Sequence, residues 1–454
     1  MMENMKKAEF RQYEMYKNTG IELIDEIPSH WKLYKAKFIF KHIIEYSKTG
    51  EEELLSVSEY YGVAAKSEMN EDSEFLTRAA TLEGYKKNNK NDLIINIMLA
   101  WKKALGVAPI DGIVSPAYAV FRIIDLEKHD PRFYHYLLRT ELYATEFKRF
   151  STGIIDSRLR LYPESFNNII LLTPPYTEQV DISNFLDHEI NKIDDTIEKS
   201  RQLIQLLKEQ RLAIINEAVT KGLDPNVPMK DSGIEWLGAV PVNWEIKRLK
   251  FIANVRSGVT KGKDLSGKEV IEFPYLRVAN VQDGYIDLSD VATIQVAEGE
   301  EKRYQLKYGD VLMNEGGDYD KLGRGAKWEA QIEPCLHQNH VFAVRPNDLS
   351  YSDWLDLITS TSYAKFYFML HSKQSTNLAS ISSFSIKELP ILLPPHNERE
   401  YIIKYIKEKT IKVDTLISKV RLQIQKLQEY RQSLISEAVT GKINVRNYGK
   451  ETQE

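Results

Sequence analysis

Two stretches, RLAIINEAVT at Arg211–Thr220 and RQSLISEAVT at Arg431–Thr440, decide how this 454-residue chain is organised. Each ends a longer block that runs from residue 171 to 220 and returns without a gap from 391 to 440, with 20 identities in 50 aligned positions. A repeat this long indicates duplicated domains and not a stacked array of short units.

A second block repeats nearer the start of each half. GIELIDEIPSHWKLYKAKFIF begins at Gly20 and returns as GIEWLGAVPVNWEIKRLKFIA from Gly233. Between the blocks, residues 41–170 and 254–390 are similar in length but show little evident identity to each other. The sequence therefore predicts two half-molecules with shared frames, which do the same mechanical job twice, and divergent inserts, which are free to differ in what they recognise.

The second half of each long block has the pattern of a helix that pairs with another helix. Apolar residues recur at three-four spacing, and no Gly or Pro interrupts the run. Pro-Pro pairs followed by a capping residue mark the entry, and Gly222 and Gly441 mark the exit. About 40 residues would make rods of roughly 60 Å. The residues expected to pair the helices are Ile193, Ile197, Ile204, Leu207, Ile214, Val413, Ile417, Ile424, Leu427 and Leu434.

The inserts contain strand-like apolar stretches, such as NDLIINIML from Asn91 and GDVLM from Gly309, together with helical segments near Tyr134 and Trp354. The expected fold class is α+β, with two tandem α/β domains separated by two long antiparallel coiled-coil helices in a pseudo-twofold repeat. The expected boundaries are 1–175 and 223–395 for the two domains, and 176–222 and 396–454 for the central and C-terminal helical regions.

Composition excludes several classes of protein. The single cysteine, Cys335, rules out an internal disulfide framework, and no segment has the length and apolarity of a signal peptide or a membrane span. We expect a cytoplasmic protein. The net charge of −4 argues against a histone-like binder, but residues 247–263 carry six basic and no acidic side chains, and residues 78–103 are also rich in Lys and Arg.

No catalytic or metal site emerges from the motifs. Thr173-Pro174-Pro175-Tyr176 resembles the motif of amino-methylating enzymes, but Thr lacks the carboxylate or amide that such a site needs. The glycines between Gly316 and Gly325 do not form a phosphate-binding loop, and His337 and His340 lack the spacing of metal ligands. We therefore expect no catalytic residue, no metal and no cofactor in this chain.

The duplicated Pro-Pro-helix blocks, the paired GIE openings with their Pro and Trp, and the EAVT helix ends resemble the specificity subunit of Type I restriction-modification systems. The resemblance covers nearly the whole chain. It implies a non-enzymatic protein with two target-recognition domains, each of which reads one half of a split, asymmetric DNA sequence. It also implies helical regions that dock two methylation subunits, with restriction (motor-nuclease) subunits joining for cleavage. S-adenosylmethionine would bind in the methylation subunits.

Double-stranded DNA is then the expected ligand, with half-sites roughly 34 to 60 Å apart. Arg and polar side chains read base edges, and Lys side chains hold phosphates. The DNA-binding candidates are Lys86, Lys87, Lys102 and Arg158 in the first domain, and Lys261, Lys263, Arg277 and Arg324 in the second.

Two other classes remain open. A stand-alone DNA methyltransferase or nuclease would need a methyl-donor or metal motif, and a coiled-coil scaffold would bind protein only. One departure from the family pattern is that the first frame begins as early as Gly20, so little chain precedes it. This short lead leaves the packing of the C-terminus against the first frame in question.

Overall fold

The computed structural model describes residues 11–21, 23–68, 81–317, 322–374, 379–446 and 448, except the side chains of Ser157 and Gln374. The chain divides into two compact units, the first made of residues 1–200 and 422–454 and the second of residues 201–421. Each unit is considered by itself. Among the described residues, no helix combines the length and the apolarity that crossing a membrane requires.

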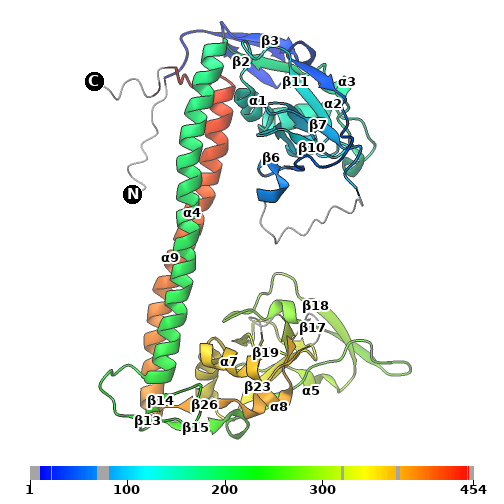
Figure 1. Ribbon diagram of the computed structural model, residues 1–454. Helices are drawn as coiled ribbons and strands as arrows, with labels where there is room; N and C mark the ends of the chain where they lie inside the picture. Colours follow the sequence, from blue (N-terminus) through cyan, green and yellow to red (C-terminus); the bar gives the residue numbers. More distant parts are fainter. Residues whose placement is uncertain are drawn as a thin grey trace. The chain divides into compact units, whose positions relative to one another are not determined.

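The first unit is framed by a hairpin and a strand pair (Figure 1). Strands β1 (Tyr16–Ile21) and β2 (Ile24–Pro28) form the hairpin, and β3 (Lys32–Lys35) pairs antiparallel with β12 (Ile170–Thr173). Pro174 and Pro175 end β12, and helix α4 (Tyr176–Lys221) follows at once. Trp31 is fully buried, and its Nε1 donates to Glu178 Oε1 at 3.0 Å, so the frame is fixed to the first turn of the helix.

The second unit repeats this frame. Strands β13 (Met229–Asp231) and β14 (Ala239–Pro241) form the hairpin, β15 (Glu245–Arg248) pairs with β26 (Pro390–Leu393), and helix α9 (His396–Val439) follows. Trp244 Nε1 donates to Glu398 Oε1 at 2.9 Å. The tryptophan and the glutamate that recur in the two sequence blocks thus make the same polar contact in both frames.

The insert of the first unit is built on an antiparallel four-stranded sheet in the order β4-β11-β8-β9. The strands are β4 (Phe40–Ile43), β11 (Ala119–Ile123), β8 (Leu93–Ile95) and β9 (Leu105–Val107). Two further pairs join β5 (Leu55–Ser58) to β6 (Gly62–Ala65) and β7 (Lys86–Asn88) to β10 (Gly112–Val114), and the helices are α1 (Pro131–Leu138), α2 (Glu141–Phe150) and α3 (Pro163–Phe166).

The insert of the second unit has an antiparallel sheet of the same order, β16-β23-β19-β21. Its strands are β16 (Ala253–Arg256), β23 (Val341–Pro346), β19 (Val311–Asn314) and β21 (Gly325–Lys327), and its helices are α6 (Ser352–Thr359), α7 (Ser362–Leu370) and α8 (Ser383–Glu388). This unit also contains α5 (Glu301–Tyr304) and two three-stranded sheets, which are formed by β17 (Val270–Leu276), β18 (Ala292–Ala297) and β22 (Leu336–His337), and by β20 (Gly316–Gly317), β24 (Lys373–Gln374) and β25 (Ala379–Ser380).

A buried ion pair sits at the same place in both sheets. Asp92, just before β8, accepts two hydrogen bonds of 2.9 Å from Arg122 on β11. Asp310, just before β19, accepts bonds of 2.7 and 2.6 Å from Arg345 on β23. The two inserts show little evident identity, but each contains a sheet with the same strand order. Each sheet is anchored by a carboxylate that is almost completely buried.

Each unit packs part of α4 against part of α9. In the first, Ile193 and Ile197 of α4 belong to the same core as Leu427 and Leu434 of α9, with Ile424 packed against it. In the second, the seam is formed by Leu207, Val413 and Ile417, with Ile204 and Ile214 beside them. The structure thus brings together, in these two groups, the residues that the heptad pattern singles out.

The end of α9 does pack against the first frame. Tyr16 Oη donates to the carbonyl of Gly441 at 3.1 Å, and the amide of Asn444 donates to the carbonyl of Arg11 at 2.7 Å. Ile443 and Val445 lie in the core of the first unit with Tyr13 and Trp31. The residues that follow α9 therefore pack against the first frame and the residues just before it.

Candidate nucleic-acid interface

Two of the four candidate side chains in the first domain are engaged within the protein. Lys86 Nζ donates to the carbonyl of Tyr118 at 2.6 Å, and burial lowers the pKa of Lys86. Lys87 lies 2.7 Å from Glu52, and this hydrogen bond is the main reason that the pKa of Glu52 falls to about 2. Contact with a phosphate would require each lysine to exchange a partner inside the protein for one on the ligand.

Lys102 and Arg158 lie on the surface and belong to a connected group. Lys102 ends a single 3-10 turn, η4 (Ala100–Lys102), and its ammonium lies 5.2 Å from the centre of the Trp101 ring. Lys148 lies 5.3 Å from the same ring and pairs with Asp156 at 3.0 Å. Asp156 begins the short turn that ends at Arg158. Two lysines thus lie at one indole ring, and Arg158 follows two residues after the aspartate that pairs with one of them. This composition is suited to phosphate contact and base stacking.

In the second domain, Lys263 and Arg277 are held by acidic neighbours. Lys263 Nζ lies 3.0 Å from Tyr304 Oη and 3.3 Å from Glu300, and the hydrogen bond to Tyr304 is the main reason that the pKa of Lys263 is raised. Arg277 lies 2.7 Å from Asp290. Arg324 is half-buried, and its Nε has no hydrogen-bond partner among the residues that the structure describes. Lys261 is exposed.

The backbone two residues before Lys261 pairs with a connection whose polar side chains sequence reasoning did not single out as DNA contacts. The amide of Val259 donates to the carbonyl of His337 at 2.7 Å, and the amide of Asn339 donates to the carbonyl of Val259 at 2.9 Å. This pairing holds the chain leading to Lys261 against the connection between β22 and β23, which carries Asn339 and the exposed His340. Amide and imidazole groups beside a lysine can combine base-edge reading with phosphate contact.

The turn between β5 and β6 is a second feature that sequence reasoning missed. Tyr60 is 84% exposed at this turn, whose backbone is held by Arg139. The guanidinium donates to the carbonyls of Tyr60 and Lys103 at 2.9 Å and of Leu105 at 2.7 Å. A signal was available in the sequence, because Tyr60-Tyr61-Gly62 is an aromatic pair followed by a turn residue. Its fixed backbone and exposed ring make this turn suitable for stacking on a base.

The side chains of Cys335, His337 and Thr173, which have catalytic or metal-binding potential, are buried within the fold. Burial raises the pKa of the Cys335 thiol to about 12, and burial lowers the pKa of His337, whose Nδ1 lies 2.6 Å from the Val341 carbonyl, to about 4. Thr173 ends β12, and Gln179 Nε2 donates to the Pro174 carbonyl at 2.8 Å within the strand-to-helix junction. The described part of the chain contains no group of three or more His, Cys, Asp or Glu placed to hold a metal ion.

The chain thus consists of two units with the same frame and the same four-stranded sheet, and the two units differ in the strands and connections around that sheet. Residues 241–426 match the family model described as type I restriction modification DNA specificity domain. The chain is also similar to curated specificity subunits of type I restriction enzymes.

Curated relatives include the EcoKI specificity subunit of Escherichia coli K12, which is 24% identical over 316 residues, 68% of this chain and 65% of the relative. The putative MjaX specificity subunit of Methanocaldococcus jannaschii is 27% identical over 207 residues, 45% of this chain and 47% of the relative. The chain thus spans slightly less than two thirds of the length of the EcoKI subunit.

Solved structures share the fold. One, described under complex assembly and conformational transition of the type I R-M system, has a TM-score of 0.66 at 14% identity and covers 91% of this chain and 98% of its own. The HsdS subunit from Thermoanaerobacter tengcongensis has a TM-score of 0.50 at 15% identity and covers 92% of this chain and 98% of its own.

Proposed function

We propose that this chain is the DNA sequence-recognition subunit of a type I restriction-modification complex, and that each of its two domains reads one half of a split, asymmetric target. One observation carries the proposal. Both domains have the same kind of sheet, anchored by Asp92 in one and by Asp310 in the other, but their surface connections differ. A common sheet supports two readers, and unlike connections give them different sequences to read.

The first reader uses the group around Trp101, Lys102 and Arg158 together with the turn at Tyr60. The second uses the connection at Asn339 and His340 together with Lys261. In both, lysines contact phosphates and the aromatic or polar side chains meet bases. Helices α4 and α9 form the antiparallel coiled-coil spacer that keeps the half-sites at a fixed separation.

The chain itself is non-catalytic in this proposal. Two methylation subunits dock on the helical regions and bring S-adenosylmethionine, and restriction subunits join them for cleavage. The family model that residues 241–426 match and the similarity of 68% of the chain to the EcoKI specificity subunit support this assignment.

The test is to co-express the chain with a cognate methylation subunit and to map methylated adenines across a host genome by single-molecule sequencing. We expect a split, asymmetric motif that requires this chain. Replacing residues 41–170 with the corresponding segment of a relative should change one half of the motif and leave the other half intact.

The same experiment separates the competing classes. Methyl transfer by the purified chain alone would establish an enzyme instead. A stable complex that produces no sequence-dependent methylation and does not bind duplex DNA would leave a protein scaffold.

A further inference from the structure

The first helix of each insert docks on the long helix of its own unit at an equivalent position. Phe133 of α1 contacts the buried Trp31 with ring centres 6.5 Å apart, and Trp354 of α6 contacts the buried Trp244 at 6.1 Å. The following helices, α2 and α7, begin at the corresponding caps Thr140 and Thr361. The gapless register that aligns these caps also aligns the two aromatic residues, and it places Asp353 where the first unit has Arg132.

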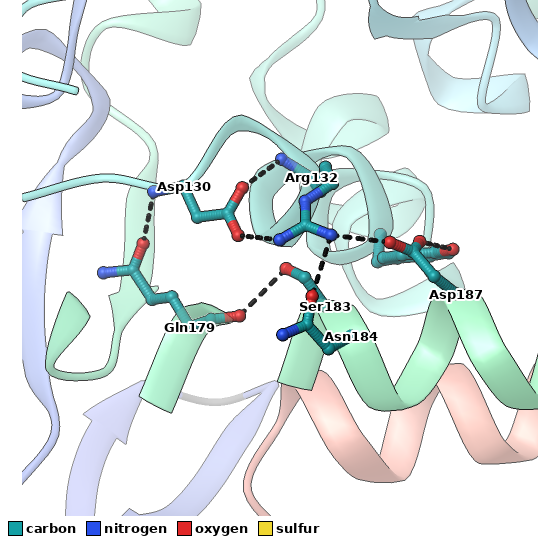
Figure 2. A network of polar contacts seen from close by, with 7 residues as sticks. Asp130, Arg132, Gln179, Ser183, Asn184 and Asp187 are labelled. Carbon is teal, nitrogen blue, oxygen red and sulfur yellow. Dashed lines mark hydrogen bonds and ion pairs between the residues drawn. The ribbon is translucent and has the colours of Figure 1, made fainter. Parts of the chain in front are cut away.

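In the first unit, the docking contact is an arginine on the insert and an aspartate on the long helix (Figure 2). Arg132 Nη1 lies 2.8 Å from Asp187 Oδ2 and 3.0 Å from Asn184 Oδ1. Its Nη2 lies 3.1 Å from Asp130, which caps α1. Tyr136 Oη donates to the other oxygen of Asp187 at 2.7 Å. Asp187 therefore receives a cation and a hydroxyl from the insert.

In the second unit, the same contact has the opposite polarity. Asp353 on α6 accepts from Lys407 on α9, and Lys407 occupies the position of Asp187 in the register that aligns the two long helices. Asp353 also accepts from Lys327 Nζ at 2.7 Å. The aspartate now belongs to the insert, and the cation belongs to the long helix.

The neutral contacts around this joint differ much less than the charges do. Both units bury a tryptophan whose indole nitrogen donates to a glutamate in the first turn of the long helix, and both place an aromatic ring of the insert against it. The nonpolar contacts of the joint are therefore of the same kind in both units, whereas the charges are not. A mismatched joint would set Arg132 against Lys407, or Asp353 against Asp187, and would replace an attraction by a repulsion.

We propose that the reversed charges at this joint determine which insert docks on which long helix, so that neither frame accepts the wrong insert from the same chain or from a second copy of it. The proposal concerns assembly of the chain and does not depend on DNA recognition. Unfolding measurements without DNA therefore test it independently of the proposed function.

The decisive experiment is a full-length chimera in which a second copy of residues 41–170 replaces residues 254–390. The insert-side partners Asp130 and Arg132 move with the insert, and the frame contributes Lys407. We expect Lys407→Asp to raise the unfolding temperature of this chimera and to lower that of the parent chain, each by about 2 to 4 °C. The effect of this substitution on the unfolding temperature should therefore change sign with the identity of the insert.

A matched control uses Lys412→Asp, which makes the same charge change at an exposed α9 position. It should shift both proteins equally and by less. The proposal is overturned if Lys407→Asp lowers the unfolding temperature of parent and chimera to the same extent, because Lys407 would then be an ordinary local contact.

A second comparison tests the proposal if the chimera folds neither with Lys nor with Asp at position 407. In the parent chain, Asp187→Lys should lower the unfolding temperature more than Asp187→Asn, because the lysine repels Arg132 while the amide only removes the attraction. Lys407→Asp should likewise be worse than Lys407→Met. Equal losses within both pairs of variants would exclude discrimination by charge.

Discussion

Arg211 pairs with Asp414 through a nitrogen-oxygen distance of 3.1 Å, and the same contact recurs in the other unit, where Arg431 pairs with Asp194 at 3.0 Å. The two arginines align with each other in the long repeat, and so do the two aspartates. Each copy of the repeat thus supplies the arginine of one pair and the aspartate of the other. The constraint explains why all four positions retain their residues while much of the helix surface differs.

These ion pairs orient the helices but add little stability. Both partners of the Arg211–Asp414 pair are partly exposed, so we expect Arg211→Ala to cost about 0.2 to 1 kcal/mol. Ile417→Ala should cost about 2 to 4 kcal/mol, because Ile417 is buried in the seam with Leu207. Denaturant unfolding of both variants measures the difference. Equal losses would contradict this division between packing and charge.

The buried carboxylates should matter far more than exposed ones. Asp310→Asn should destabilise the second unit by about 3 to 5 kcal/mol, because it leaves the Arg345 guanidinium without its buried counter-charge. Asp290→Asn, which weakens an exposed pair with Arg277, should cost less than about 1 kcal/mol. Thermal unfolding with hydrogen exchange on β19 and β23 would locate the loss. An unchanged β19 in Asp310→Asn would argue against the anchor.

Two groups at equivalent places in the two units should respond to acid in opposite directions. His135 accepts from the amide of Val107 in the first unit, and burial lowers its pKa to about 3. Asp356 accepts from the amide of Lys327 at the equivalent place in the second, and burial raises its pKa to about 6.

The depressed histidine contributes stability that is lost as pH falls from about 6.5 towards 3, because only the unfolded chain then binds the proton. The raised pKa of Asp356 has the opposite effect on stability. The folded form binds the proton at Asp356 below about pH 6, so the contribution of Asp356 to stability rises as pH falls towards 4, on the order of 2 kcal/mol. Hydrogen exchange of α1 and α6 between pH 4 and 7 would show this, and Asp356→Asn should flatten the profile of α6 alone.

Exposed lysines and engaged ones should differ in how they affect DNA binding. Lys102→Ala and Lys261→Ala should weaken binding of all duplex sequences to a similar degree, and each should reduce the slope of log affinity against log salt by about 1. Lys86→Ala should chiefly lower stability, because Lys86 holds the Tyr118 carbonyl. Fluorescence titrations with the assembled complex at several salt concentrations would separate these effects. If Lys102→Ala leaves the salt slope unchanged, Lys102 does not contact a phosphate.

The frames could be predicted from the sequence because their residues make specific contacts. Trp31 and Trp244 each donate to one glutamate, and loss of the glutamate would leave the buried indole N–H without its acceptor. The common sheet of the inserts was harder to see. Asp92 and Asn96 recur as Asp310 and Asn314, but the three residues between them need only be apolar, so two identities carry the whole signal.

The contact between the first helix of each insert and its long helix could not be predicted from the sequence for a different reason. Arg132 and Asp353 occupy equivalent positions with opposite charges, which in an alignment looks like divergence. Likewise, the sequence identifies a lysine as basic but does not show what it contacts. Lys86 donates to a carbonyl of its own chain, whereas Lys102 lies exposed. The DNA-binding residues stay predictions, because no contact within the chain tests them.

Arg139 holds the turn at Tyr60 through backbone carbonyls alone, and no side chain of the turn takes part in these bonds. The turn is thus held by Arg139, which lies outside it, and by the Ser58 hydroxyl, which accepts from the amide of Tyr60 at 3.1 Å, and not by the side chains of Glu59 and Tyr60. Substitutions at Glu59 and Tyr60 can accumulate without loss of that shape, so a new binding preference can evolve here with little risk to folding.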